Sequence, residues 1–379
     1  MIYKEFQEIE LSALGFGAMR LPTTAGEPNG PIDEKQTAEM VAYAIEHGIN
    51  YFDTAYGYHD GQSEVVMGNV LSQYPRESYY LADKFPGYDL SNMDKVEAIF
   101  EEQLAKCGVD YFDFYLLHNI YEKNVDPYMD EKYGIMDYLL AQKKARGIRH
   151  LGFSAHGRYD TMEKFLKVYG KEMEFCQIQL NYLDWKLQDA KAKVELLEQY
   201  RIPVWVMEPL RGGALAKLSD ENTAKLAALR PEESVPAWAF RFLQSVTSVK
   251  MVLSGMSNLE QMKENIKTFE AKKPLTEQEM TALTEVADSM LDILPCTACR
   301  YCTAHCPQQL DIPVLLSLYN ETRFANGLIT HMAVDALPEE RRPNACIGCK
   351  SCEAVCPQQL AIADAMGDFV EKLNQPAGL

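Results

Sequence analysis

The stretch Asn50-Tyr-Phe-Asp-Thr-Ala-Tyr-Gly-Tyr-His-Asp-Gly-Gln-Ser-Glu64 decides the fold of this chain. Residues 49–52 read as a short buried strand, and the glycine-rich polar residues that follow predict a loop leading into a helix over residues 62–71. Asp53 therefore ends a strand, and Tyr58 follows in the loop. An acid at a strand end with a phenol close behind it can place a proton donor over a pocket, but this pair alone does not define a site.

Short apolar runs alternate with amphipathic helical stretches from residue 13 to about residue 270. Asp33 with Gln36 predicts a helix-capping box, Gly48 ends that helix, and Ser257 with Glu260 predicts another box after the last strand. Eight strand–helix units indicate an α/β protein with a (β/α)8 TIM barrel. A doubly wound sheet is the alternative, which is disfavoured because no glycine-rich dinucleotide fingerprint follows the first strand. The expected strands are residues 13–16, 49–52, 79–84, 111–118, 149–154, 175–180, 202–208 and 249–254.

Polar side chains end most of the expected strands, which is where such barrels place their chemistry. Taken singly, these residues have ordinary explanations, such as a turn former, a solvated charge or a satisfied core histidine. A ring of ionisable groups around one barrel mouth instead predicts an active site. The residues in question are Asp53, Lys84, His118, Ser154, Gln179, Glu208 and Ser254.

Five motifs together resemble the aldo-keto reductases, over roughly residues 1–270: Phe52-Asp-Thr-Ala-Tyr-Gly-Tyr58, Ala82-Asp-Lys84, Leu116-Leu-His118, Gly152-Phe-Ser154 and Glu208-Pro-Leu-Arg-Gly-Gly213. The resemblance implies an oxidoreductase that reduces a small carbonyl compound with NADPH or NADH. It also implies a catalytic tetrad of Asp53, Tyr58, Lys84 and His118. In that tetrad we expect the Lys84 cation to lower the pKa of Tyr58, with Asp53 holding Lys84 in place. His118 is expected to orient the substrate oxygen.

The nicotinamide pocket that the resemblance implies departs from the family pattern. Ser154 and Gln179 match two residues that hold the nicotinamide carboxamide, whereas Ala155 stands where the family has an asparagine. Met207 stands where an aromatic residue is usual, and Gln261 where an arginine often contacts the cofactor phosphate. NADP and NAD therefore both remain open. The cofactor-binding residues that the resemblance implies are Ser154, Gln179, Leu210, Gly213, Gly255, Ser257, Gln261 and Asn265.

Two cysteine-rich segments, residues 296–307 and 346–357, follow the barrel and are called combs here. Each has the spacing C-x2-C-x2-C-x3-C-P. Corresponding cysteines lie 50 residues apart, and both combs end in Cys-Pro-Gln-Gln-Leu, so the segment is an internal duplication. This spacing is the signature of bacterial two-cluster ferredoxins, in which the fourth cysteine serves the other cluster. A structural zinc site is the alternative, but it needs only four ligands. The expected [4Fe-4S] ligands are Cys296, Cys299, Cys302 and Cys356 for one cluster and Cys346, Cys349, Cys352 and Cys306 for the other.

The chain should therefore contain two domains: an aldo-keto reductase barrel over residues 1–290 and a two-cluster 4Fe-4S domain over residues 291–379. Residues 312–326 and 329–337 read as helical, so the second domain resembles the α-helical ferredoxins. This arrangement matches the iron–sulfur branch of the family. A hydride carries two electrons and a cluster ordinarily carries one, and no flavin motif is visible that would couple them.

The composition limits the classes of partner that the protein is expected to bind. A formal charge of -18 and a pI near 4.9 disfavour nucleic acid and anionic membranes. The absence of a signal-peptide core or a membrane-spanning run predicts a cytoplasmic protein. Three functions stay open. The first is a carbonyl reductase whose clusters transfer electrons, with an electron-transfer protein as a candidate partner. The second is a reductase whose clusters are structural or oxygen-sensing, and the third is a nicotinamide-binding sensor or electron-transfer subunit without turnover.

Overall fold

The computed structural model describes residues 1–24, 26 and 30–378. Contacts divide the chain into two compact units, Met1–Asp184 with Asp189–Leu283, and Trp185–Gln188 with Thr284–Leu379. Among the described residues, no helix is both long and apolar enough to cross a lipid bilayer.

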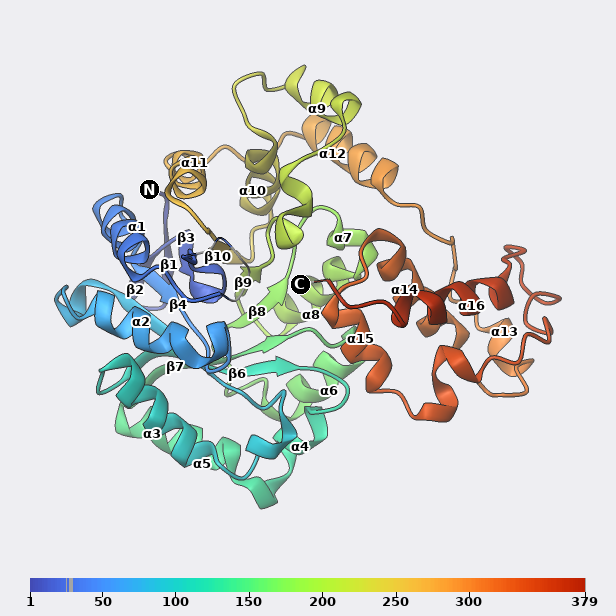
Figure 1. Ribbon diagram of the computed structural model, residues 1–379, viewed down its shortest axis with the longest axis horizontal. Coiled ribbons are helices and arrows are strands. Elements are labelled where there is room, and N and C mark those ends of the chain that lie inside the picture. The colour runs from blue at the N-terminus through green and yellow to red at the C-terminus, as the bar shows by residue number, and fades with distance from the viewer. Residues whose placement is uncertain (25, 27–29, 379) are drawn as a thin grey trace. The chain divides into compact units, whose positions relative to one another are not determined.

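In the first unit, eight parallel strands close into a barrel in the order β10-β3-β4-β5-β6-β7-β8-β9 (Figure 1). This confirms the predicted (β/α)8 fold over a doubly wound sheet. Each expected strand is present within about two residues of its predicted bounds. The strands are β3 (Leu14–Gly17), β4 (Tyr51–Asp53), β5 (Tyr80–Phe85), β6 (Phe112–Ile120), β7 (Ile148–Ala155), β8 (Cys176–Gln179), β9 (Val204–Met207) and β10 (Val249–Gly255).

The helices that follow the strands pack around the outside of the barrel, and α1, α2, α3 and α5 lie side by side (Figure 1). The helices of this unit are α1 (Glu34–Glu46), α2 (Gln62–Leu71), α3 (Val96–Cys107), α4 (Val125–Met129), α5 (Ile135–Ala145), α6 (Tyr159–Tyr169), α8 (Ala190–Gln199), α9 (Asp220–Ala227), α10 (Val235–Ser245) and α11 (Leu259–Phe269). The boundary between the units falls within or beside α7 (Asp184–Leu187) and α12 (Glu277–Met290).

Two predicted helix starts have different outcomes. Asp33 caps α1, because its carboxylate accepts a hydrogen bond from the Gln36 N–H at 2.9 Å. The box predicted at Ser257 and Glu260 is wrong: α11 begins one residue later than a cap at Ser257 implies, and Asn258 caps it by accepting from the Gln261 N–H at 2.9 Å. An asparagine side chain caps a helix as well as serine does, so the local signal was ambiguous by one residue.

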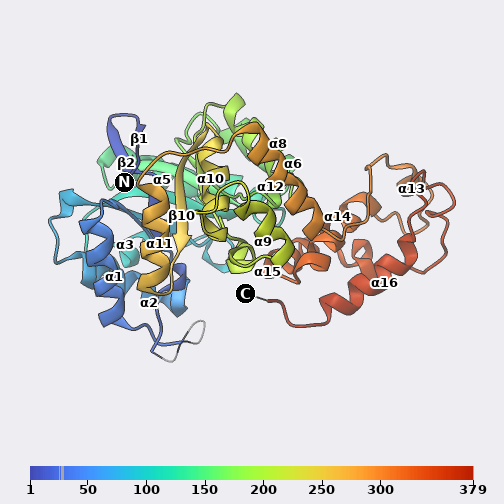
Figure 2. The ribbon, with the colours of Figure 1, turned by 90° about the horizontal axis from the view of Figure 1, so that it is seen from above.

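A hairpin of β1 (Tyr3–Phe6) and β2 (Ile9–Ser12) precedes the barrel and projects from it in Figure 2. Phe6 from this hairpin packs in one buried cluster with Phe114, Phe175 and Trp205 of the barrel strands. Its ring centroid lies 5.0 Å from that of Trp205 and 5.7 Å from that of Phe114. The hairpin therefore contributes apolar side chains to the barrel interior.

This interior cluster shows which strand residues face inward. Tyr51, Ala82, Phe114, Leu116 and Trp205 belong to it. Side chains alternate across a strand with a period of two, so the residues two positions further toward the carboxyl ends also face inward. Those residues are Asp53, Lys84, His118 and Met207. The barrel thus has an apolar base and a polar mouth.

The second unit has its own apolar core, built mainly by α14 (Ile312–Phe324) and α16 (Ile362–Leu373). Leu315 and Leu316 of α14 and Met366 and Phe369 of α16 are buried in it. The predicted helices over residues 312–326 and 329–337 are present as α14 and α15 (Leu328–Asp335), and a single turn, α13 (Tyr301–Ala304), lies in the first comb.

Candidate functional site

Lys84 is the centre of a buried polar group at the barrel mouth. Its ammonium donates to Asp53 Oδ1 at 2.6 Å, to the Thr54 carbonyl at 2.7 Å and to the Tyr58 hydroxyl at 3.3 Å. Three acceptors match its three N–H donors. Burial disfavours the charged ammonium, but the Asp53 carboxylate, together with Tyr58 and Asp83, outweighs this and raises the pKa of Lys84 above its ordinary value. Lys84 is therefore a permanent cation beside the phenol.

The loop after β4 presents Tyr58 to this cation. His59 and Asp60 both have left-handed backbone conformations, with φ of 50° and 53°, and Gly61 follows at 82°. The loop therefore turns back sharply before α2 begins at Gln62. The short path from the strand end to the helix holds the Tyr58 hydroxyl next to Lys84.

Lys84 acts on the pKa of Tyr58 in the expected direction and lowers it, but the net shift is upward. Burial raises that pKa above its ordinary value, and although the Lys84 charge opposes the rise it does not overcome it. Desolvation favours the neutral form of a phenol. Tyr58 is thus a protonated phenol with a cation at its oxygen, which suits a proton donor.

His118 lies beside Tyr58, with their ring centroids 6.1 Å apart and nearly perpendicular. The ring of Tyr88 also lies beside His118, edge-on with the ring centroids 5.2 Å apart. Burial, followed by the charge of Lys84, holds the pKa of His118 well below its ordinary value, so the imidazole is neutral. A neutral imidazole carries one N–H donor and one acceptor nitrogen. All four predicted tetrad residues are therefore gathered at one end of the barrel.

The predicted carboxamide residues lie on neighbouring strands. The Ser154 hydroxyl accepts from the Asn119 N–H at 2.7 Å, and Ser154 pairs in register with Gln177 of β8. Gln179 ends β8 and pairs with Met207 of β9. Gln177 pairs with Trp205, whose side chain is in the barrel interior, so Gln177 and Gln179 share the inward face.

Gln177 was not singled out from the sequence, although its spacing of two from Gln179 could have indicated it. The residue is 3% exposed, and its Oε1 has no hydrogen-bond partner among the described residues. Asp184 was also missed. It is fully buried, pairs with Arg211, and accepts from Gln179 Nε2 at 2.8 Å. No sequence signal links Asp184 and Arg211, which lie 27 residues apart.

The remaining predicted cofactor residues fall in two loops. Leu210 and Gly213 belong to the turn after β9, where the Gly213 N–H donates to the Leu210 carbonyl at 2.9 Å and Gly213 adopts φ of 100°. An added Cβ at Gly213 would meet nothing within 4 Å, so this glycine serves the backbone conformation. Gly255 ends β10, where an added Cβ would lie 3.2 Å from Arg20 Cδ.

The loop between β10 and α11 is occupied by its own side chains. Gln261 Oε1 accepts from the Ser257 N–H at 2.9 Å, and Asn265 donates to the Ser254 hydroxyl at 3.1 Å. Ser254 therefore does not join the ring at the mouth. Its neighbour Leu253 faces the barrel interior, so Ser254 points the other way, toward α11.

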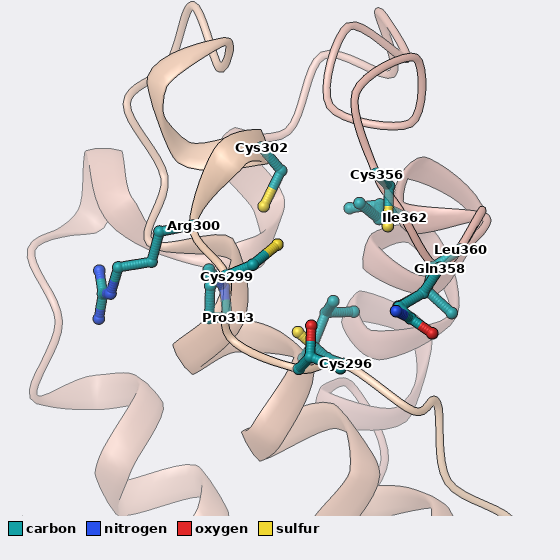
Figure 3. Close-up of a pocket in the computed structure, with 11 residues that line it drawn as sticks. Cys296, Cys299, Arg300, Cys302, Pro313, Cys356, Gln358, Leu360 and Ile362 are labelled. Carbon is teal, nitrogen blue, oxygen red and sulfur yellow. The ribbon is translucent and has the colours of Figure 1, made fainter.

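The cysteines of the second unit form two sets. Cys296, Cys299, Cys302 and Cys356 line one cavity, with Arg300 and Gln358 beside them (Figure 3). A second cavity is lined by Cys306, Cys346, Cys349 and Cys352. Each set takes three thiols from one comb and the fourth from the other. In the described part of the chain, no three such side chains converge closely enough to hold a single metal ion; the thiols of each set instead surround a cavity.

The backbone of each comb suits an anionic cluster. Ala298 and Arg300 in the first comb, and Gly348 and Lys350 in the second, all have left-handed conformations, with φ between 52° and 68°. Alternating left- and right-handed residues direct successive N–H groups into one concavity, an arrangement common at iron–sulfur sites. The four-thiol cavities and these backbones fit a cluster better than an ordinary apolar core.

Comparison with known proteins identifies both units. The family model described as "Aldo/keto reductase family" matches residues 13–288. The chain belongs to the aldo/keto reductase family. The description "4Fe-4S dicluster domain" matches residues 295–361, so this aldo/keto reductase carries a ferredoxin-type domain at its C-terminal end. The strand-end motifs and the cysteine combs had predicted this combination.

Relatives support an oxidoreductase. One is the "Uncharacterized oxidoreductase YqkF" of Bacillus subtilis, 26% identical, with 73% of this chain and 92% of that protein covered. Another is the "NADH-specific methylglyoxal reductase" of Escherichia coli, also 26% identical, with 75% and 97% covered. This aldo/keto reductase is therefore an oxidoreductase enzyme.

Solved structures share the barrel. The aldo-keto reductase AKR11C1 from Bacillus halodurans aligns with a TM-score of 0.60 at 23% identity and covers 76% of this chain and 96% of its own. An aldo-keto reductase from Klebsiella pneumoniae in complex with NADPH aligns with a TM-score of 0.59 at 18% identity and covers the same shares, 76% and 96%. At these identities the likeness speaks for the fold alone.

Proposed function

We propose that this protein reduces the carbonyl group of a small molecule with NADH or NADPH, using Asp53, Tyr58, Lys84 and His118. The observation that carries the proposal is the Lys84 ammonium, which joins the Asp53 carboxylate at 2.6 Å and the Tyr58 hydroxyl at 3.3 Å. Carbonyl reduction needs a hydride on carbon and a proton on oxygen. The hydride would come from the reduced nicotinamide when it is bound.

Each tetrad residue has a definite task in this proposal. Tyr58 gives its hydroxyl proton to the substrate oxygen, and the Lys84 cation stabilises the phenolate that remains. Asp53 keeps Lys84 charged and in place. The neutral His118 donates an N–H to the substrate oxygen and so orients the carbonyl toward Tyr58. Solvent then returns a proton to Tyr58.

The nicotinamide pocket is proposed around Ser154, Gln177 and Gln179. The Oε1 atoms of Gln177 and Gln179 are buried and lack hydrogen-bond partners among the described residues. Buried carbonyl oxygens normally have a donor, so an amide group bound at this end of the barrel would supply what is missing. The loop residues Leu210, Gly213, Gly255 and Ser257 remain proposed contacts for the rest of the dinucleotide, with Gln261 and Asn265 acting through the loop they support.

For the second unit we propose two [4Fe-4S] clusters with crossed ligation, one on each four-cysteine set. Cys299 and Cys349 are exposed, one in each set, so each cluster would reach the surface of its domain. The chemistry that the clusters would supply is one-electron transfer. Surface access favours electron exchange, with an external carrier or with the barrel, over a purely structural role.

The first test is Tyr58→Phe with Tyr56→Phe as its matched control. Tyr56 lies in the same loop, but its hydroxyl binds Glu102 at 3.0 Å and not the tetrad. Methylglyoxal and other small aldehydes are the first substrates, with NADH, because of the reductase relative. We expect Tyr58→Phe to lower kcat about 10²- to 10⁴-fold with nicotinamide affinity retained, while Tyr56→Phe stays near the wild type. Equal turnover in all three proteins would exclude the proposed tetrad.

The clusters are tested by an anaerobic titration of cluster-loaded protein with NADH and then NADPH. Exchange of electrons within the chain should bleach the cluster absorption band as the nicotinamide is oxidised. If the band stays unchanged while carbonyl turnover proceeds at its full rate, the clusters are structural or sensing. Iron analysis of Cys302→Ser, with the buried barrel residue Cys107→Ser as control, checks the ligand set.

A further inference from the structure

Asp184 is a buried carboxylate that collects donors from two loops of the barrel unit. Its side chain has no exposed surface and forms an ion pair with Arg211. Its Oδ2 also accepts from Gln179 Nε2 at 2.8 Å and from Asn181 Nδ2 at 2.6 Å. The carboxylate therefore ties the end of β8 to the loop after β9.

The ion pair decides how the amide of Gln179 is turned. An ionised carboxylate only accepts hydrogen bonds, so the Gln179 group that faces it must be the NH2 group. The amide is planar, and its oxygen is then directed away from Asp184. Gln179 as a whole is 6% exposed, and its Oε1 has no partner among the described residues. Gln179 thus presents a fixed, unpaired acceptor.

This acceptor lies at the polar mouth. Gln179 is the last residue of β8 and shares the inward face of the barrel with Gln177, which pairs with the interior residue Trp205. A buried oxygen without a donor lowers affinity for any ligand that leaves it unpaired and repels one that brings a second anionic oxygen. A ligand with an N–H group at this point satisfies it.

We propose that Asp184 is a positioning residue that fixes Gln179 as a hydrogen-bond acceptor, so that the site binds the primary amide of a nicotinamide dinucleotide and rejects the corresponding carboxylate. The inference rests on the proposed function, because it assumes that the ligand at this end of the barrel is a nicotinamide. It identifies the primary amide as the part of that ligand that the site recognises, and Asp184 as the residue that sets this recognition.

The test compares two oxidised dinucleotides that differ only in this group, the amide form and its carboxylic acid analogue, by calorimetric titration of the cluster-loaded protein. We expect the wild type to bind the amide form about 30- to 100-fold more tightly. In Asp184→Asn, the new amide can donate to Gln179 Oε1, which lets Gln179 turn its NH2 group toward the ligand. The preference should then fall about tenfold or more.

Gln179→Met removes the acceptor and leaves the Asp184–Arg211 pair intact, so it decides the matter if Asp184→Asn fails to fold. It should also lose most of the preference. The control is Asp160→Asn, because the Asp160 side chain is 71% exposed and its change should leave the preference as in the wild type. A merely structural role for Asp184 would weaken both dinucleotides equally and leave their ratio unchanged.

The outcomes separate this inference from the proposed function. An unchanged ratio in folded Asp184→Asn and Gln179→Met overturns the inference alone. Binding with the expected preference but no carbonyl reduction overturns the proposed reaction and supports the recognition of the amide through Gln179. A wild type that binds neither dinucleotide overturns both.

Discussion

The buried pair of Lys84 and Asp53 should dominate the local stability of the barrel mouth, and Asp53→Asn tests this. The substitution keeps the shape of the side chain and removes its charge. Lys84 is fully buried and Asp53 is 3% exposed, so no water can replace the lost partner. The Thr54 carbonyl and the Tyr58 hydroxyl remain as neutral acceptors of the ammonium.

The magnitude follows from that burial. Breaking a buried ion pair by removing one partner costs about 3–5 kcal/mol, because the other charge is left uncompensated. For a unit of this size, that corresponds to a fall in Tm of roughly 10 °C. An exposed pair should cost far less. Lys132 and Asp130, at 2.8 Å, have side chains 64% and 38% exposed, so solvent screens this pair and Asp130→Asn should leave the free energy of unfolding close to that of the wild type.

The pH dependence has a definite sign. In the wild type the pKa of Lys84 is raised, so the contribution of the Lys84 ammonium is complete below the unfolded value of about 10.4 and is lost only as pH rises through the higher native value. Burial also raises the pKa of Asp53 above its ordinary value, against the opposing charge of Lys84, so Asp53 affects the pH dependence only on the acid side. In Asp53→Asn, burial without its counter-charge should lower the Lys84 pKa. The folded variant then releases its proton more readily than the unfolded chain, and its stability should rise with pH between about 7 and 10.

The assay is urea unfolding of cluster-loaded protein at several pH values. Fluorescence follows Trp205 and Trp238, which are both buried in the barrel unit. We expect the difference in the free energy of unfolding between the wild type and Asp53→Asn to narrow as pH rises. The difference between the wild type and Asp130→Asn should stay small at every pH. A loss no larger than that of the control, or a gap that widens with pH, would refute the reasoning.

Three further changes test other parts of the structure. Phe6→Ala should cost about 3–5 kcal/mol in urea unfolding, because its ring fills the barrel interior beside Trp205; a loss below about 1 kcal/mol would contradict that packing. Gly348→Ala should cost about 1–2 kcal/mol in thermal unfolding from its φ of 68° alone, since an added Cβ meets nothing within 4 Å; an unchanged Tm would count against the left-handed comb. The kcat/KM profile should show no ionisation of His118 between about pH 6 and pH 8, since its pKa is held well below the ordinary value, and a limb near pH 6.5 that vanishes in His118→Gln would disprove a neutral imidazole.

The architecture and both cysteine combs could be predicted because their signals are local. Strand-end residues such as Asp53 and Lys84 are recognisable from short apolar runs, and a parallel barrel brings all carboxyl ends to one mouth. The combs repeat a fixed spacing, so counting residues was enough to recognise Cys296 and Cys346 as equivalent positions of the duplication. The cap of α11, Asn258, was missed by one residue, because serine and asparagine cap helices equally well.

By itself the sequence determined the order of strands and helices, the duplication in the second unit and the residues available for chemistry, since each of these depends on neighbours a few positions apart. Only the tertiary structure decided what depends on burial and on contacts between distant segments. Burial outweighed the expected effect of Lys84 and left the pKa of Tyr58 above its ordinary value. Strand alternation turned Ser254 toward Asn265 and away from the mouth. Folding also brought Arg211 to Asp184, and a buried charge acquires its partner only when the chain has closed around it.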